Sequence, residues 1–163
     1  VANTTRAHLI GLLGEEVAYE YCKTTKNLLA TSWPALYERR AVLAANTPRE
    51  KRAAKAKFAG RGDITRLHED GKWEHIEVKS SRKELLTCAV TQTHVNKYLK
   101  DKVDTVMFSA IDLEDRKGFI ALESPMNEVK DWKVVKLNGV SNRIPSSFCD
   151  NPPSKYSSAS DEV

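Results

Sequence analysis

Apolar residues near the start of the chain recur every three or four positions, which is the spacing of one face of an α-helix. Ile10, Leu13, Val17 and Tyr21 follow this spacing, so the pattern predicts a helix over residues 9 to about 26. Residues 28–46 show no comparable period, and we expect them to be irregular or helical. The chain is therefore expected to open with one long amphipathic helix.

A second helix is marked by its first residues rather than by an apolar face. Thr47-Pro48-Arg49-Glu50 places a capping threonine before a proline at the first helical position, with a glutamate three residues after the cap. This arrangement, a capping box, satisfies backbone amides that would otherwise lack partners at the start of a helix. It predicts a helix from residue 47 to about residue 58.

From residue 63 onward, short apolar and alternating runs replace the helical pattern. Asp70-Gly71 is a hairpin turn between the first two of these runs. The order helix, strand, strand, strand, helix, strand predicts an α/β fold in which a mixed central sheet is flanked by helices. Strands are expected over 63–68, 73–80, 85–90, 103–113, 118–122 and 132–137, and a helix over 91 to about 102.

The length of 163 residues fits one domain. We expect residues 1–144 to form it, with a basic helical insertion at about 31–60. Residues 145–163 contain three prolines and six serines, which predicts a disordered tail. No apolar run approaches the roughly 18–20 residues that a membrane span needs, so a transmembrane protein is excluded.

Cysteine usage bears on the compartment. The three cysteines, Cys22, Cys88 and Cys149, are odd in number and widely spaced, and they form no CxxC pair. This pattern suits neither a disulfide framework nor a zinc site. We therefore expect a reducing compartment, the cytoplasm.

The net charge of +4 is modest but unevenly placed. Residues 39–61 hold eight basic residues against one acid, Glu50. Such a block is typical of a surface patch for a polyanion, although a solvated, lysine-rich helix would have the same composition. The basic residues are Arg39, Arg40, Arg49, Lys51, Arg52, Lys55, Lys57 and Arg61.

Three ionisable residues carry the chemistry of the chain. In the strand that begins at residue 73, Ile76 and Val78 point to one face, and Glu77 and Lys79 point to the other because side chains alternate. Asp63 begins the partner strand, where the hairpin would bring it across from Glu77.

Two converging carboxylates repel each other unless a cation lies between them. Oxygen ligands of this kind suit a hard divalent ion such as Mg²⁺, for which Mn²⁺ can substitute. A lysine beside the ion could orient or deprotonate water and stabilise charge on a phosphate. The residues thus favour metal-assisted phosphodiester hydrolysis.

This constellation resembles the PD-(D/E)xK nuclease superfamily, which includes restriction enzymes, junction resolvases and some homing endonucleases. Asp63 matches the first carboxylate and Glu77-Val78-Lys79 the ExK element, although Gly62 stands where the family pattern has proline. Residues 11–18 are similar to the G-x-x-G-E-x-x-A first helix of small bacterial members.

The resemblance implies a restriction-endonuclease-like core of order αβββαβ and Mg²⁺-dependent hydrolysis of DNA that leaves a 5′-phosphate and a 3′-hydroxyl. It implies that Asp63, Glu77, the Val78 carbonyl and Glu15 bind the metal, and that Lys79 positions or activates water. Gln92 lies where many members place a glutamine or lysine near the active site. The basic insertion, with Ser80 and Ser81, would then contact phosphates.

Alternatives remain at several positions. Glu77 and Lys79 could be a solvent-facing pair on an edge strand, Glu16 competes with Glu15, and Gln92 could simply cap its helix. For the whole chain, the alternatives are a nuclease toxin domain that acts on tRNA or DNA and has an immunity protein, and a non-catalytic nucleic-acid-binding protein of the same fold. Cleavage of both DNA strands would require a homodimer or higher assembly.

Overall fold

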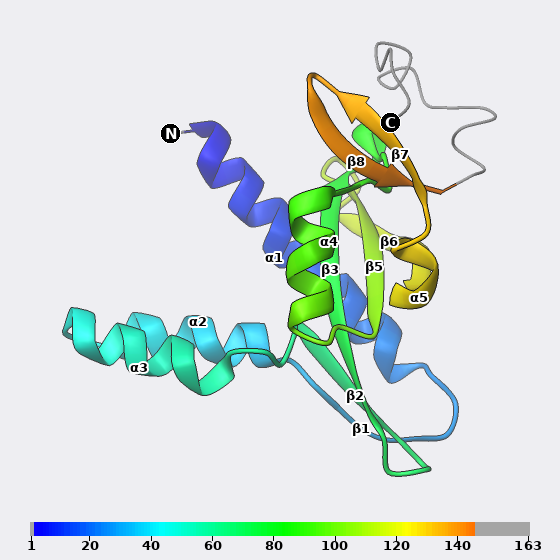
Figure 1. The fold of residues 1–163 in the computed structure, drawn as a ribbon. Helices are drawn as coiled ribbons and strands as arrows, with labels where there is room; N and C mark the ends of the chain where they lie inside the picture. Colours follow the sequence, from blue (N-terminus) through cyan, green and yellow to red (C-terminus); the bar gives the residue numbers. More distant parts are fainter. Residues whose placement is uncertain (1, 146–163) are drawn as a thin grey trace.

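The computed structural model describes residues 2–145, with side chains from residue 6 onward, and shows the predicted mixed α/β fold (Figure 1). Residues 146–163 of the expected tail lie outside the described residues. In chain order the elements are α1 (Ala2–Lys23), β1 (Leu28–Ser32), α2 (Pro34–Ala44), α3 (Pro48–Phe58), β2 (Ile64–His68), β3 (Trp73–Arg82), the 3-10 turn η1 (Lys83–Leu85), β4 (Val90–Thr91), α4 (Gln92–Lys100), β5 (Thr105–Asp112), β6 (Lys117–Pro125), α5 (Met126–Val129), β7 (Lys133–Leu137) and β8 (Val140–Ile144).

The central sheet has five strands in the order β1-β2-β3-β5-β6. Strand β3 lies in the middle, antiparallel to β2 and parallel to β5. The β2–β3 ladder ends at the pair Ile64 and Ile76, whereas β3 continues alongside β5 as far as Arg82. Beyond Ile76, the edge of β3 that faces away from β5 therefore does not pair with β2.

Helices cover both faces of this sheet, and each face has its own apolar cluster. Helix α1 packs on one face, where Ala18 and Cys22 join Ile76 and Met107 in a buried cluster. Helix α4 packs on the other face through a cluster that includes Tyr98. Burial of this apolar surface, at about 25 cal/mol per Å², is the main term that holds the helices to the sheet.

A smaller sheet extends the α4 side of the molecule. It has three strands in the order β4-β8-β7, all antiparallel. Val90 of β4 belongs to the apolar cluster under α4, and Ile144 of β8 is buried. The strand predicted over 132–137 is thus present as β7, and β8 was not predicted.

Two sequence-based expectations about the strands are wrong. Residues 85–90 do not form a strand of the main sheet, because η1 and a left-handed backbone at Cys88 (φ 49°) interrupt that run. Residues 28–32, which were expected to be irregular or helical, form β1. This strand pairs with β2 and completes the set of three strands before α4. The order α1, β1, β2, β3, α4, β5 therefore follows the predicted helix–strand order with different residues in the first strand.

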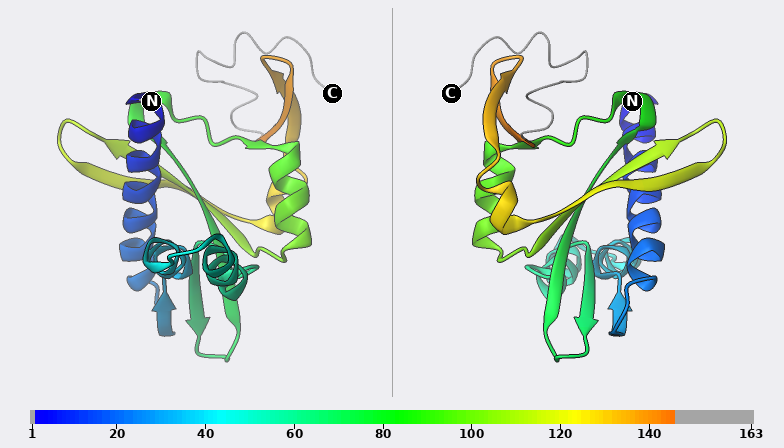
Figure 2. Two further views of the ribbon diagram at one scale, coloured as in Figure 1. Left: turned by 90° about the vertical axis from the view of Figure 1, so that its left-hand side faces the viewer. Right: turned by 90° about the vertical axis from the view of Figure 1, so that its right-hand side faces the viewer.

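The basic insertion forms a helical arm, which we define as α2 and α3. Its two helices pack on each other and extend away from the sheet (Figures 1 and 2). The predicted N-cap is confirmed, since Thr47 Oγ1 accepts a hydrogen bond of 3.1 Å from the Glu50 amide. The Glu50 carboxylate accepts from the Asn46 amide at 2.7 Å rather than from the Thr47 amide, so the capping box is present only in part. No residue of α3 is buried, so its cations lie in solvent on an element that contributes little to the core.

A buried ion-pair network ties β2 to its neighbours. The guanidinium of Arg66 donates to Glu74 at 2.9 and 2.8 Å and also to Glu123. His68 lies 2.7 Å from Glu74, and the Thr105 hydroxyl donates to the same carboxylate. Removing one partner of such a network costs about 3–5 kcal/mol, because it leaves an uncompensated charge in the interior.

Acid should weaken the fold through Glu74. Burial alone would raise its pKa, but hydrogen bonds from Arg66, Thr105 and His68 lower it below the ordinary 4.5. A folded-state pKa below the unfolded one stabilises the protein above pH 4.5 and loses this contribution as the pH falls through the folded value. We expect the free energy of unfolding, measured in urea between pH 6 and pH 3.5, to fall less in Glu74→Gln than in the wild type. Glu69→Gln, an exposed carboxylate, is the control and should follow the wild type; equal acid losses in Glu74→Gln and the wild type would contradict this assignment.

Within residues 2–145, no helix has both the length and the apolar character that crossing a bilayer requires.

Candidate active site

The alternation predicted for β3 is confirmed. Ile76 is buried and Val78 packs with it against α1. On the opposite face, Glu77 and Lys79 lie beside Val106 and Phe108 of β5, which belong to the apolar cluster under α4. The glutamate and the lysine therefore stand between the sheet and α4 on a central strand, and the alternative of a solvent-facing pair on an edge strand is wrong.

Asp63 meets Glu77 at the point where β2 begins. The Asp63 amide donates to the Ile76 carbonyl at 2.9 Å, and its carboxylate accepts from the Val78 amide at 2.8 Å. Gly62, with φ of 74°, passes so close to β3 that a Cβ there would lie 3.0 Å from the Ile76 carbonyl oxygen. This close approach explains why the position before Asp63 favours glycine.

The two carboxyl groups lie close enough to affect each other's titration, and the pKa of each is raised. Burial, with the Glu15 charge next, raises the pKa of Asp63. Burial, with the Asp63 charge next, raises the pKa of Glu77. Two carboxylates side by side repel each other unless a cation or a proton lies between them.

Lys79 continues the same face of β3. Burial lowers its pKa, although the charges of Glu77 and Asp63 act in the opposite direction. Its Nζ lies 3.4 Å from Nδ1 of His94 on α4. An ammonium group has no acceptor, so His94 is the acceptor and is neutral at this contact. Burial, followed by the Lys79 charge, lowers the pKa of His94, which agrees with a neutral ring.

His94 is held in place from two directions. Its ring stacks on Tyr98 with a centroid distance of 5.8 Å and an interplanar angle of 7°. Its backbone amide donates to the Thr91 hydroxyl, the N-cap of α4, at 3.2 Å. The sequence alone did not single out this histidine, because only the packing of α4 on β3 and β5 shows which residue faces Lys79.

Glu15 lies close to the carboxylate pair but has partners of its own. Its carboxylate accepts from the Trp33 indole at 2.9 Å and from both terminal nitrogens of Arg39, at 2.7 and 3.3 Å. Trp33 in turn stacks on Tyr19. Arg39, predicted to contact phosphate, is thus engaged by Glu15 here. The choice between the two helix glutamates favours Glu15, since the exposed Glu16 lines a separate groove described below.

Two glycines of the first-helix motif have different environments. A Cβ on Gly14 would lie 1.8 Å from Ser80 Oγ and 2.4 Å from Ser80 Cβ, and the Gly14 carbonyl accepts a 2.8 Å hydrogen bond from Ser109. Gly11 has no atom within 4 Å of such a Cβ. Gly14 therefore sets the distance between α1 and the sheet, and places the neighbouring Glu15 next to Asp63.

Three of the predicted site residues have other surroundings. Ser80 packs against Gly14 on the α1 face of β3, away from the face of Lys79. The Gln92 amide accepts from Arg143 at 3.0 Å and donates to Asn96 at 3.1 Å, so it links α4 to β8. This bridge, rather than an N-cap, is its structural role, because Thr91 is the N-cap. Ser81, half-buried, lies one residue further along β3.

The predicted phosphate-binding cations are mostly exposed. Their side chains extend from the helical arm and from the loop that leads through Asp63 into β2. The exposed members are Arg40, Lys51, Arg52, Lys55, Lys57 and Arg61.

The donors at the site fit a hard cation. Among the described residues, no group of three or more His, Cys, Asp or Glu side chains is arranged to hold a metal ion. Asp63 and Glu77 supply two carboxylates, and the Val78 carbonyl points to the same strand edge as its amide, which bonds Asp63. Mg²⁺ is commonly bound through one or two carboxylates while waters and a phosphate complete the octahedron, so this oxygen set suits it. Glu15 as a further ligand stays a prediction.

Comparison with protein-family models, with curated proteins and with solved structures gives no match to the chain.

Proposed function

We propose that the protein is a Mg²⁺-dependent endonuclease that hydrolyses phosphodiester bonds in DNA, with a restriction-endonuclease-like core. The single observation that carries the proposal is the placement of Asp63 and Glu77 beside Lys79. Burial raises the pKa of both carboxyl groups, and the Asp63 charge raises that of Glu77 further. Strongly perturbed carboxyl groups next to a buried amine are typical of catalytic sites. If the two residues had only a structural role, apolar side chains at these positions would make the protein at least as stable.

Each residue has a distinct part in the proposed reaction. Asp63, Glu77 and the Val78 carbonyl would hold the ion, which when bound lowers the pKa of a coordinated water and neutralises charge on the scissile phosphate. Lys79 orients the attacking water and donates to the phosphate oxygens on which charge grows. The water oxygen bonds to phosphorus as the bond to the 3′-oxygen breaks, leaving a 5′-phosphate and a 3′-hydroxyl.

The helical arm supplies the affinity for nucleic acid in this proposal. Its exposed cations neutralise backbone phosphates and release counterions, so binding should weaken steeply with salt. Such contacts position the duplex without reading sequence. Arg39 has a different part, because its bidentate contact fixes Glu15 beside Asp63.

A substrate panel tests the proposal. Purified protein is incubated with supercoiled plasmid, linear duplex, four-way junctions and tRNA, in Mg²⁺, in Mn²⁺ and in EDTA. We expect metal-dependent nicking of plasmid that EDTA stops. Cleavage of tRNA alone would favour a toxin domain, and binding without cleavage in either metal would favour the non-catalytic alternative.

His94 should position Lys79, and three variants separate this role from packing. Asparagine places its oxygen near Nδ1, glutamine places it near Nε2, and phenylalanine keeps the ring that stacks on Tyr98 but offers no acceptor. Because a hydrogen bond to a charged group contributes about 1.5–3 kcal/mol, we expect His94→Phe and His94→Gln to lower the nicking rate by roughly tenfold or more. His94→Asn should stay within a few-fold of the wild type at an unchanged KM. A His94→Phe protein that folds normally and cuts at the wild-type rate would refute the role.

A further inference from the structure

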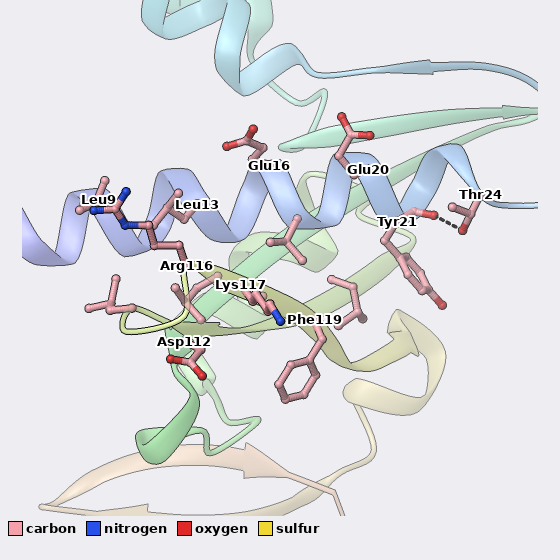
Figure 3. A pocket seen from close by; sticks show the side chains of 15 residues that line it. Leu9, Leu13, Glu16, Glu20, Tyr21, Thr24, Asp112, Arg116, Lys117 and Phe119 are labelled. Atoms are coloured by element: carbon pink, nitrogen blue, oxygen red, sulfur yellow. Dashed lines mark hydrogen bonds between the residues drawn. The ribbon is translucent and has the colours of Figure 1, made fainter.

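A groove lies between α1 and the hairpin formed by β5 and β6 (Figure 3). Its volume is about 920 Å³, and Leu13, Val17, Ile111 and Ile120 are among the apolar residues that line it. At its base the helix and hairpin touch, since a Cβ on Gly118 would lie 2.6 Å from a methyl carbon of Val17. The groove contains none of Asp63, Glu77 and Lys79, so it is separate from the candidate active site.

The walls of the groove expose large apolar side chains. Leu9 is 48% exposed and Phe119 is 50% exposed, and Tyr21 is exposed beside them. Figure 2 shows that the β5–β6 hairpin crosses α1 and that its tip projects beyond the helix. A contiguous apolar surface of this kind on a monomer usually marks an interaction site.

The two walls carry charges of opposite sign. On the helix wall, Glu16 and Glu20 are exposed one turn apart, and Glu20 lies 3.3 Å from Lys23. On the hairpin wall, Arg116 and Lys117 are exposed, whereas the acid of that wall, Asp112, is paired with Lys83 at 3.3 Å. The preceding acids of the hairpin turn, Glu114 and Asp115, are outside the groove lining. The surface is thus apolar in the middle, acidic along one side and basic along the other.

We propose that this groove is the contact surface of a two-fold homodimer, in which α1 of each copy lies against the β5–β6 hairpin of the other. A two-fold axis parallel to the groove places the acidic wall of one copy on the basic wall of its partner, twice. An axis across the groove would place like charge on like charge. Self-complementarity of this kind is what an isologous interface requires, and complementary charges fix its register.

Charge reversal tests the proposal without reference to catalysis. The full chain is studied by sedimentation velocity, and we expect the wild type to be a dimer. Glu16→Lys/Glu20→Lys makes both walls basic, and Arg116→Glu/Lys117→Glu makes both walls acidic. Each should raise the dimer Kd by about a hundredfold. Mixed in equal amounts, the two variants should form a heterodimer, because both contacts between them are again complementary.

A matched control keeps the test specific. Arg49→Glu/Lys51→Glu makes the same charge change on exposed α3 residues outside the groove, and this protein should stay dimeric. Circular dichroism verifies that every variant is folded. A monomeric wild type, a dimer that neither groove variant weakens, or two monomeric variants that do not associate when mixed would overturn the proposal. Because the readout is assembly, a catalytically inactive wild type would leave this result unaffected.

Discussion

Replacing Glu77 with glutamine will abolish metal-dependent cleavage and at the same time stabilise the metal-free protein. Glutamine keeps the size of the side chain but removes the charge that repels Asp63 in a buried site. Loss of a metal ligand removes several kcal/mol of transition-state stabilisation, so plasmid nicking should fall by about 10³-fold or more. Relief of the buried repulsion should raise the free energy of unfolding at pH 8 by on the order of 1 kcal/mol.

The opposite signs of these effects make the prediction specific. A residue needed only for folding would lose activity and stability together. Lys79→Met should also abolish cleavage, yet it should keep the metal affinity of the wild type because both carboxylates remain. Glu114→Gln, an exposed carboxylate in the β5–β6 turn, is the matched control for the Glu77 change and should alter neither quantity. Full cleavage activity in Glu77→Gln would rule out the proposed role of this residue.

Adding one methyl group at Gly14 will destabilise the protein, whereas adding one at Gly11 will not. The Gly14 methyl would overlap Ser80, whose Cβ is only 2.4 Å from the new carbon. Overpacking of a close contact costs about 1–3 kcal/mol, and the shift of α1 should reduce cleavage because Glu15 follows Gly14 directly. Gly11 faces open space, so alanine there should add up to about 1 kcal/mol through helix propensity.

The pair is measured by urea denaturation at one pH. Ser80→Gly should recover part of the loss caused by Gly14→Ala, because it removes the atoms that collide. If Gly14→Ala were as stable as Gly11→Ala, the close packing of α1 on β3 described above would be wrong.

How much the sequence could predict depended on whether the signal was local. Strand β3 could be found from its alternation, and the capping box located α3 because Thr47 and Glu50 are neighbours in the chain. Strand β1 was missed since only pairing with β2 makes it a strand, and its burial pattern has no clear period. Residues 85–90 have strand-like composition, but the left-handed backbone at Cys88 interrupts them.

The candidate site divides in the same way. Asp63 and Glu77 could be paired from the hairpin, whose short turn fixes the register. The partners of Glu15 could not, because Trp33 and Arg39 reach it only through the fold of the insertion. The place of Gln92 in the sequence suits an active-site residue. In the structure, however, its amide oxygen accepts a hydrogen bond from Arg143, which lies 51 residues away in the chain. Long-range contacts of this kind leave no periodic trace in one sequence.

The most direct measurement for the central claim is Mn²⁺ binding followed by electron paramagnetic resonance. We predict one bound ion per wild-type chain, competed by Mg²⁺, retained in Lys79→Met and lost when Asp63→Asn and Glu77→Gln are combined. Binding that the double variant leaves unchanged would show that the buried carboxyl pair holds no metal ion, and the hydrolytic account would have to be abandoned.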